Sequence, residues 1–209
     1  MSDRLTDPDG AMRAYYDRRA REYDSWWLGT RLFADRDRPG WDAERDALLA
    51  LLVALPPART LDVACGSGFL TRALPGDVTG LDQSAEMVAV ARANLPHATV
   101  LQGEGLPLPF ADGAFERIFT SHFYGHLHPD ERTAFVAEAR RVAGELIVCD
   151  SHVRPGIPDE EWQGRVLEDG TRTQVYKRWF SGASLAAELG GGEILLDGEW
   201  FAVVSSAAS

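Results

Sequence analysis

The stretch that decides the fold is Leu61-Asp62-Val63-Ala64-Cys65-Gly66-Ser67-Gly68. It has the pattern of a buried strand that ends in a loop of small residues. Such a loop lets a ligand approach the backbone closely and exposes amide groups at the start of a helix. In a doubly wound sheet, the turn after the first strand borders the ligand crevice. A tight strand-to-helix turn needs glycine even without a ligand, so the surrounding sequence has to separate these two interpretations.

Short apolar runs alternate with helical segments on the carboxyl side of this loop. This alternation predicts a parallel sheet with helices on both faces. Ser84 suits the N-cap of one helix and Pro129 the first turn of the next. The expected strands are 60–64, 78–82, 98–102, 115–120 and 145–150, and the expected helices are 69–74, 84–95, 130–142 and 181–189.

The last two apolar runs, 193–197 and 200–206, are separated by only Gly198 and Glu199 at the centre of their turn. That is too short for a helical crossover, so the two runs should form an antiparallel hairpin. The prediction is an α/β fold with a Rossmann-like, doubly wound, mostly parallel sheet and a final antiparallel strand.

Residues 1–58 contain no alternating strand pattern. They hold a polar, aromatic-rich stretch at 11–27 and an apolar helix at 42–55, which Pro56 and Pro57 close because proline removes a backbone donor and restricts its predecessor. We expect an N-terminal helical lid segment at 1–58 and a Rossmann-like core at 59–209.

The composition excludes several classes of partner. With 209 residues, 32 acidic and 21 basic, the chain has a net charge of −11, so nucleic acid and anionic membrane surfaces are poor partners. The longest apolar run, 47–55, is far shorter than the ~18–20 residues of a membrane span. Residues 1–10 carry early acids and no apolar core, which predicts no secretory signal and a cytoplasmic protein. Cys65 and Cys149 are expected to be buried structural residues, and the oligomeric state is not encoded in any pattern here.

The next two expected strands also end in polar residues suited to a nucleoside. Asp82 ends the second strand, where a carboxylate can accept hydrogen bonds from ribose hydroxyls. At the end of the third strand, Glu104 can accept from an adenine amino group and the amide of Gly105 can donate to the ring. The alternative for Asp82 is a helix N-terminal acid that only suits the helix dipole. Three successive strand ends therefore point to a nucleoside cofactor.

The loop argues against a nicotinamide cofactor, because Phe69, Leu70 and Thr71 follow Gly68 where a third glycine would be needed. An acid before a small-residue loop instead resembles the class I S-adenosylmethionine-dependent methyltransferases. The form D-V-A-C-G-S-G is similar to their small-molecule branch, which includes quinone-biosynthesis C-methyltransferases. Further matches are GLDQSAEMVAVAR at 80–92, LPLPFADGAFERIF at 106–119 and AFVAEARRV at 134–142.

The resemblance implies S-adenosylmethionine as cofactor, S-adenosylhomocysteine as product and a small-molecule acceptor. Two departures matter: alanine stands at 64, where many members have glycine, and the fourth strand lacks the Asn/Asp-Pro-Pro-Tyr motif of enzymes that methylate amide or base nitrogens. The implied cofactor-binding residues are Tyr16, Tyr23 and Trp27 in the lid, Asp62, Ala64, Gly66 and Ser121 at the methionine moiety, and Asp82, Gln83, Met87, Gly103, Glu104 and Gly105 at the adenosine.

Methyl transfer from a sulfonium is an in-line displacement in which the protein positions and desolvates the acceptor, and a base is needed only if the acceptor must lose a proton. The candidate bases follow the fourth strand: His122, Tyr124 and His126. Each can instead be structural. A metal site built from these histidines and His128 is not favoured, because no carboxylates lie nearby at ligand spacing, so no metal is expected.

The segment 151–180 is the natural second wall of an acceptor pocket, although it can also be a structural connector. Its Arg154, Arg172 and Lys177 suggest an anionic acceptor. Two alternative functions remain: a protein that binds S-adenosylmethionine without transferring its methyl group, and a nicotinamide-dependent oxidoreductase.

Overall fold

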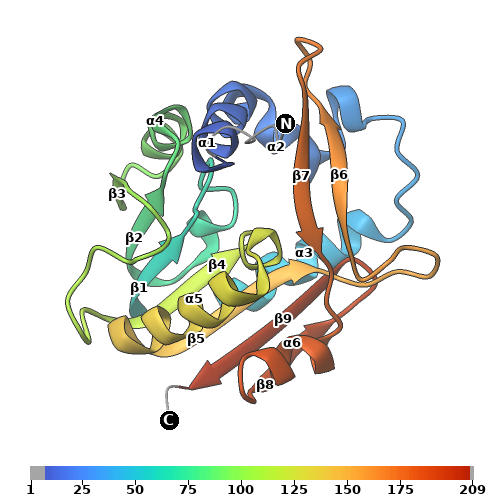
Figure 1. Cartoon of the computed structure of the whole chain (residues 1–209). Coiled ribbons are helices and arrows are strands. Elements are labelled where there is room, and N and C mark those ends of the chain that lie inside the picture. The colour runs from blue at the N-terminus through green and yellow to red at the C-terminus, as the bar shows by residue number, and fades with distance from the viewer. Residues whose placement is uncertain (1–7, 208–209) are drawn as a thin grey trace, which may run out of the picture.

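The computed structural model describes residues 8–207, and residues 1–7, on which the secretory-signal prediction mostly depends, lie outside that range (Figure 1). Nine strands and the surrounding helices are formed within it. The α-helices are α1 Pro8–Arg19, α2 Tyr23–Leu28, α3 Trp41–Val53, α4 Ala85–Asn94, α5 Pro129–Val142 and α6 Gly182–Glu188. The strands are β1 Ala58–Val63, β2 Gly76–Asp82, β3 Thr99–Gln102, β4 Phe115–Ser121, β5 Ala143–Ser151, β6 Glu160–Val166, β7 Arg172–Arg178, β8 Glu193–Asp197 and β9 Phe201–Ala207. The short 3₁₀ turns are η1 Ala20–Glu22, η2 Arg31–Phe33, η3 Thr71–Ala73 and η4 Tyr124–His126.

Seven of these strands form one sheet in the order β3-β2-β1-β4-β5-β9-β8. The first five run parallel, and β9 pairs antiparallel with both β5 and β8. This confirms the predicted fold class, including the final antiparallel strand and the β8–β9 hairpin. The strand order reverses between β1 and β4, so the carboxyl ends of β1, β2 and β4 border the crevice of a doubly wound sheet.

The alternating side chains of the strands form two separate cores. Ile118 of β4 and Val148 of β5 face α5 and α6, whereas Phe119 and Ile147 face α3 on the other side. Because successive side chains of a strand point to opposite faces, a strand buried on both sides is apolar at consecutive positions. This is why the central runs read as continuous apolar stretches.

Two local predictions are confirmed and one is wrong. Ser84 caps α4 by accepting a hydrogen bond from the Met87 amide, and Pro129 begins α5. The predicted helix at 69–74 is instead a single 3₁₀ turn, η3, because Pro75 follows Leu74 and leaves no room for an α-helix after the glycine loop.

The segment 151–180 contains a hairpin that the sequence analysis did not resolve. Strands β6 and β7 pair antiparallel, from Glu160 opposite Arg178 to Val166 opposite Arg172. Figure 1 shows this hairpin standing above the carboxyl edge of the sheet, on the same side as α1 and α2. The α1–α2 segment and the hairpin therefore enclose the sheet edge where the strands end. No helix within residues 8–207 is long and apolar enough to cross a membrane.

Candidate active site

The loop after β1 requires small residues because its backbone is left-handed at three positions. The φ angles are +59° at Ala64, +55° at Gly66 and +82° at Gly68. A Cβ on Gly68 would lie 2.6 Å from Leu95 Cδ1. A Cβ on Gly66 would lie 3.2 Å from the ring of Tyr23. The loop is therefore packed closely between Leu95, at the end of α4, and Tyr23 of α2.

Two buried carboxylates support this loop. Asp62 accepts a hydrogen bond from the Thr71 hydroxyl at 2.5 Å, and burial raises the pKa of its carboxyl to about 7. Asp82 accepts from the amides of Gly66 and Ser84, both at 2.9 Å, and burial raises its pKa to about 6. Thr71 occupies the position where a nicotinamide fingerprint would have its third glycine, and here its hydroxyl orients Asp62 instead.

The end of β3 lies beside Asp82. The Gly103 amide donates to the Asp82 carbonyl at 2.9 Å, and Glu104 forms an exposed ion pair with Arg13 of α1. A Cβ on Gly105 would lie 2.8 Å from Phe123 Cζ, so the chain passes closely there. The structure thus brings the three strand ends together, as predicted. Nearby, Met87 is fully buried, and the Gln83 carbonyl accepts from the Gln102 side chain at 3.1 Å.

The helices α1 and α2 cover these strand ends through polar and aromatic contacts. Asp17 accepts from the Ser84 hydroxyl at 2.6 Å, and Asp24 accepts from the Ser67 hydroxyl. Tyr16 lies 6.4 Å from Tyr23 between ring centroids, and burial raises the pKa of the Tyr16 phenol to about 12. Both tyrosines are therefore neutral hydroxyl groups at the covered strand ends.

A small cavity remains at the end of β1. Its volume is about 10 Å³, room for about one water molecule. Trp27 forms one wall and stacks on Phe69 with ring centroids 5.0 Å apart. The sequence-predicted residues that meet at this cavity are Tyr23, Trp27, Asp62, Ala64 and Ser121.

His122 follows β4 in a strained backbone conformation, with φ +53°. Its Nδ1 lies 3.2 Å from the Ser151 hydroxyl and 3.7 Å from Asp150 Oδ1, and its buried Nε2 has no hydrogen-bond partner. Because Nδ1 faces a carboxylate, the ring proton belongs on Nδ1 and the lone pair on Nε2. Burial lowers the pKa of His122, and Asp150 offsets part of that effect. The ring is therefore neutral at pH 7, with a free acceptor nitrogen.

Asp150 anchors His122 and was not singled out by the sequence analysis. It is fully buried, pairs with the ammonium of Lys177 on β7, and accepts from the Gly125 amide at 2.7 Å. Burial raises the pKa of Asp150, but Lys177 and His122 outweigh this and hold it well below its usual range. The sequence hypothesis that Lys177 receives an anionic acceptor is therefore wrong, because Asp150 already neutralises this ammonium.

The other predicted bases are held by protein contacts. Tyr124 is 1% exposed and packs between Phe135 and Phe180. His126 donates from Nδ1 to the Tyr176 carbonyl at 2.7 Å, and burial lowers its pKa to about 3. Of the three, His122 directly follows Ser121, which lines the small cavity, and its ring is 5.3 Å from that of Trp27, another lining residue.

The two cysteines are buried, and burial raises both thiol pKa values. Cys65 packs closely against Gly80, since a Cβ added to Gly80 would lie 2.9 Å from the Cys65 sulfur. Cys149 lies inside β5. A protonated, enclosed thiol is a poor nucleophile, in agreement with the structural role expected of both.

Comparison with known proteins finds similarity to methyltransferases. A methyltransferase-domain family model matches residues 60–145. An uncharacterized methyltransferase of Synechocystis sp., sll0829, is 30% identical over 161 residues, 64% of this chain and 76% of that protein. A demethylmenaquinone methyltransferase of Thermotoga maritima is 30% identical over 148 residues, 67% of this chain and 61% of that protein. A solved complex of DhpI with SAM and HEP has a TM-score of 0.73 at 25% identity and covers 96% of this chain and 99% of its own.

The chain belongs to the class I S-adenosylmethionine-dependent methyltransferases and resembles their quinone-biosynthesis members. The residues fit S-adenosylmethionine, because a left-handed small-residue loop and buried acids at the ends of β1 and β2 meet at one edge of the sheet. S-adenosylmethionine is therefore the cofactor, and the alternative functions are not favoured. The match covers less than two thirds of the Thermotoga protein, so the acceptor is a separate question.

Proposed function

We propose that the chain transfers a methyl group to a small organic acceptor by in-line displacement, with His122 as the general base. The cofactor supplies a methyl group on a positively charged sulfur. Asp82 would hold its ribose, Glu104 and the 103–105 backbone its adenine, and Asp62, Ala64, Gly66 and Ser121 its methionine moiety.

The observation that carries the assignment of the base is the unpartnered Nε2 of His122. This nitrogen is buried without a hydrogen bond, while Nδ1 faces Asp150 and Ser151. A buried acceptor without a partner is costly, so a donor from a bound acceptor molecule would relieve it. His122 then accepts the acceptor's proton at Nε2, and Asp150 stabilises the imidazolium that forms.

The aromatic residues around His122 exclude water from the reaction. Its ring lies 4.9 Å from Trp26 and 5.3 Å from Trp27 between centroids, in edge-on and tilted arrangements. Exclusion of water strengthens the interactions of charged groups inside the site. Electron-rich rings also attract a cationic sulfur, by about 0.5–2 kcal/mol each.

We further propose that residues 1–58 act as the lid on a 59–209 core. The cavity beneath Tyr23 and Trp27 is far smaller than a nucleoside, so α1 and α2 have to move for the cofactor to enter. Their contacts with the core at Ser67, Ser84 and Glu104 are polar side-chain pairs, which exchange readily with water.

The test compares His122→Asn with His97→Asn. Asparagine tolerates the left-handed backbone at 122 but provides no base, and His97 is an exposed histidine in the turn between α4 and β3. With a panel of acceptors, mass spectrometry would follow products about 14 Da heavier and the release of S-adenosylhomocysteine. We expect His122→Asn to bind S-adenosylhomocysteine normally but to lose roughly 10²–10⁴-fold in kcat.

The pH profile gives a second readout. A base works only when it is deprotonated, and burial lowers the pKa of His122 below its usual value. In the pH profile of kcat, the midpoint of the acidic limb should therefore lie below pH ~6.5. Normal turnover by His122→Asn on an acceptor that must lose a proton would remove this residue from the mechanism.

A further inference from the structure

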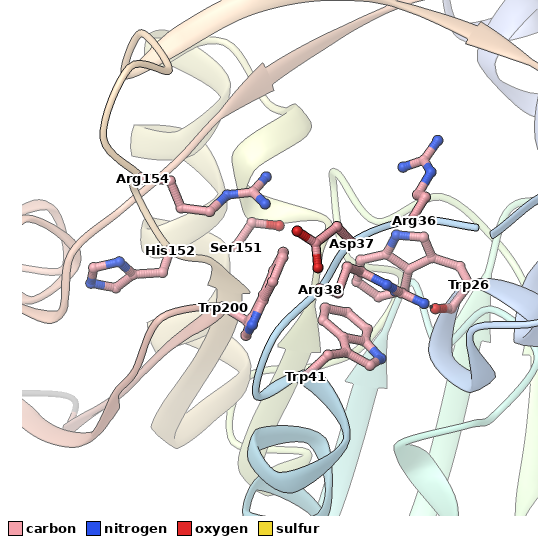
Figure 2. A pocket seen from close by; sticks show the side chains of 9 residues that line it. All are labelled: Trp26, Arg36, Asp37, Arg38, Trp41, Ser151, His152, Arg154 and Trp200. Atoms are coloured by element: carbon pink, nitrogen blue, oxygen red, sulfur yellow. Dashed lines mark hydrogen bonds between the residues drawn. The ribbon is translucent and has the colours of Figure 1, made fainter. Parts of the chain in front are cut away.

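A cavity of about 250 Å³ is lined by Trp26 of α2, next in sequence to Trp27, which lines the small cavity at the end of β1 (Figure 2). Arg36, Asp37 and Arg38 enter it from the loop before α3, and Arg154 enters from the loop after β5. Figure 2 shows the Arg154 side chain reaching toward the 36–38 segment, while His152 points away. The apolar walls of the cavity are the indole rings of Trp26, Trp41 and Trp200.

The three guanidinium groups of this cavity are not paired with acids. Within residues 8–207, none of them forms an ion pair, although the chain carries a net charge of −11. Asp37 contributes a carboxylate to the lining, which leaves three cations against one anion. Burial lowers the pKa of both Arg36 and Arg154, and the charge of Arg36 lowers the pKa of Arg154 further, so these two cations repel each other.

Aromatic and backbone contacts hold two of these arginines in place. Arg38 donates to the Trp26 carbonyl at 2.8 Å and lies 4.2 Å from the Trp41 ring centroid. Arg154 lies 4.7 Å from the Trp200 ring centroid. Guanidinium groups stacked on indoles keep their N–H donors at the edge free for a ligand.

Two residues that line the cavity also contact the proposed base. Ser151 lines it, and the Ser151 hydroxyl is 3.2 Å from Nδ1 of His122. Trp26 lines it as well and packs on the His122 ring. A molecule held at the arginines would extend toward His122 and the end of the cofactor cavity.

We infer that this cavity binds an anionic group, a carboxylate or a phosphate-type oxyanion, on the methyl acceptor. Guanidinium groups match such oxyanions because they donate pairs of parallel hydrogen bonds, and a bound anion would relieve the repulsion among the arginines. The inference depends on the proposed function only in taking the occupant to be the acceptor. It moves the anion site predicted at 151–180 to Arg154 and the 36–38 loop, since Arg172 is exposed on the hairpin and Lys177 is already paired.

The experiment measures binding of inorganic phosphate and of acetate, each titrated at constant ionic strength into wild type, Arg36→Gln, Arg154→Gln and the control Arg172→Gln. Arg38 is not changed, because it also supports the Trp26 backbone. We expect phosphate, acetate or both to bind to wild type and Arg172→Gln, and to bind at least about tenfold more weakly to the other two variants. Stronger binding of phosphate would indicate a tetrahedral dianion, and stronger binding of acetate a carboxylate.

Binding of S-adenosylhomocysteine, measured in parallel, separates this inference from the proposed function. Normal binding of it by all variants shows that they are folded. If neither anion binds to wild type, or if Arg36→Gln and Arg154→Gln bind as tightly as Arg172→Gln, the anion site is refuted while methyl transfer still stands. If the anions bind and depend on Arg36 and Arg154 while His122→Asn turns over normally, the proposed base is refuted and the anion site still stands.

Discussion

Substitution of Ala64 by glycine should stabilise the protein, whereas substitution of a helical alanine by glycine destabilises it. Its φ of +59° places a Cβ in the left-handed region, which costs about 1–2 kcal/mol for an L-residue. Replacement by glycine removes that strain but adds about 0.5–1 kcal/mol of unfolded-state entropy. We therefore expect Ala64→Gly to stabilise the protein by about 0.5–1 kcal/mol.

The control is Ala89→Gly, the same chemical change at an exposed position within α4. There glycine should destabilise by about 1 kcal/mol, since the helical φ suits alanine. For a chain of this length 1 kcal/mol shifts Tm by about 2–4 °C, so thermal and urea unfolding can resolve the two signs. If Ala64→Gly lost as much stability as Ala89→Gly, the strain assigned to this loop would be wrong.

Three further substitutions test polar groups that stabilise the fold. Glu44→Ala should lose about 2–3 kcal/mol in urea unfolding, because this carboxylate accepts from three amides of the β8–β9 turn, whereas Asp46→Ala on the same helix should lose under 1 kcal/mol. Lys177→Met should lose about 3–5 kcal/mol, because it leaves Asp150 buried without its counter-charge, and a loss below 1 kcal/mol would contradict that pairing. Asp62 keeps its proton up to about pH 7 when folded but only to near pH 4 when unfolded, so this contribution to stability is present at low pH and lost as the pH rises through 7. Asp62→Asn has no such proton. Between pH 4 and 8 the unfolding free energy of this variant should therefore fall by roughly 3–4 kcal/mol less than that of the wild type. The same pH dependence in both proteins would argue against the raised pKa.

The sheet could be predicted from the sequence because its determinants are local. Each central strand is a short apolar run bounded by glycine, proline or acids, and Ser84 and Pro129 mark helix starts by their own chemistry. The meeting of Asp82 and Glu104 followed from parallel strands ending at one edge. The helix predicted at 69–74 is wrong because Pro75 ends the segment after a single 3₁₀ turn, although the segment has an apolar pattern.

The β6–β7 hairpin had a usable signal that was missed. Asp169-Gly170 is a strong turn pair, and Val175 and Tyr176 in the following strand are residues that favour strands. His122 comes near Asp150, 28 residues away, because β4 pairs with β5, whereas Lys177 joins them only when the β6–β7 hairpin folds over β5, which no local pattern indicates. The unpaired state of Arg36 and Arg154 is likewise a property of three-dimensional placement.

Consecutive tryptophans on α2 serve two different chambers. Trp27 closes the chamber at the cofactor loop, and Trp26 forms a wall of the arginine-lined chamber. One rigid turn of helix carries both indoles, so any displacement that widens the first chamber must also reshape the second. We therefore expect occupancy of the two chambers to be thermodynamically linked, so that a ligand in either one changes the affinity of the other.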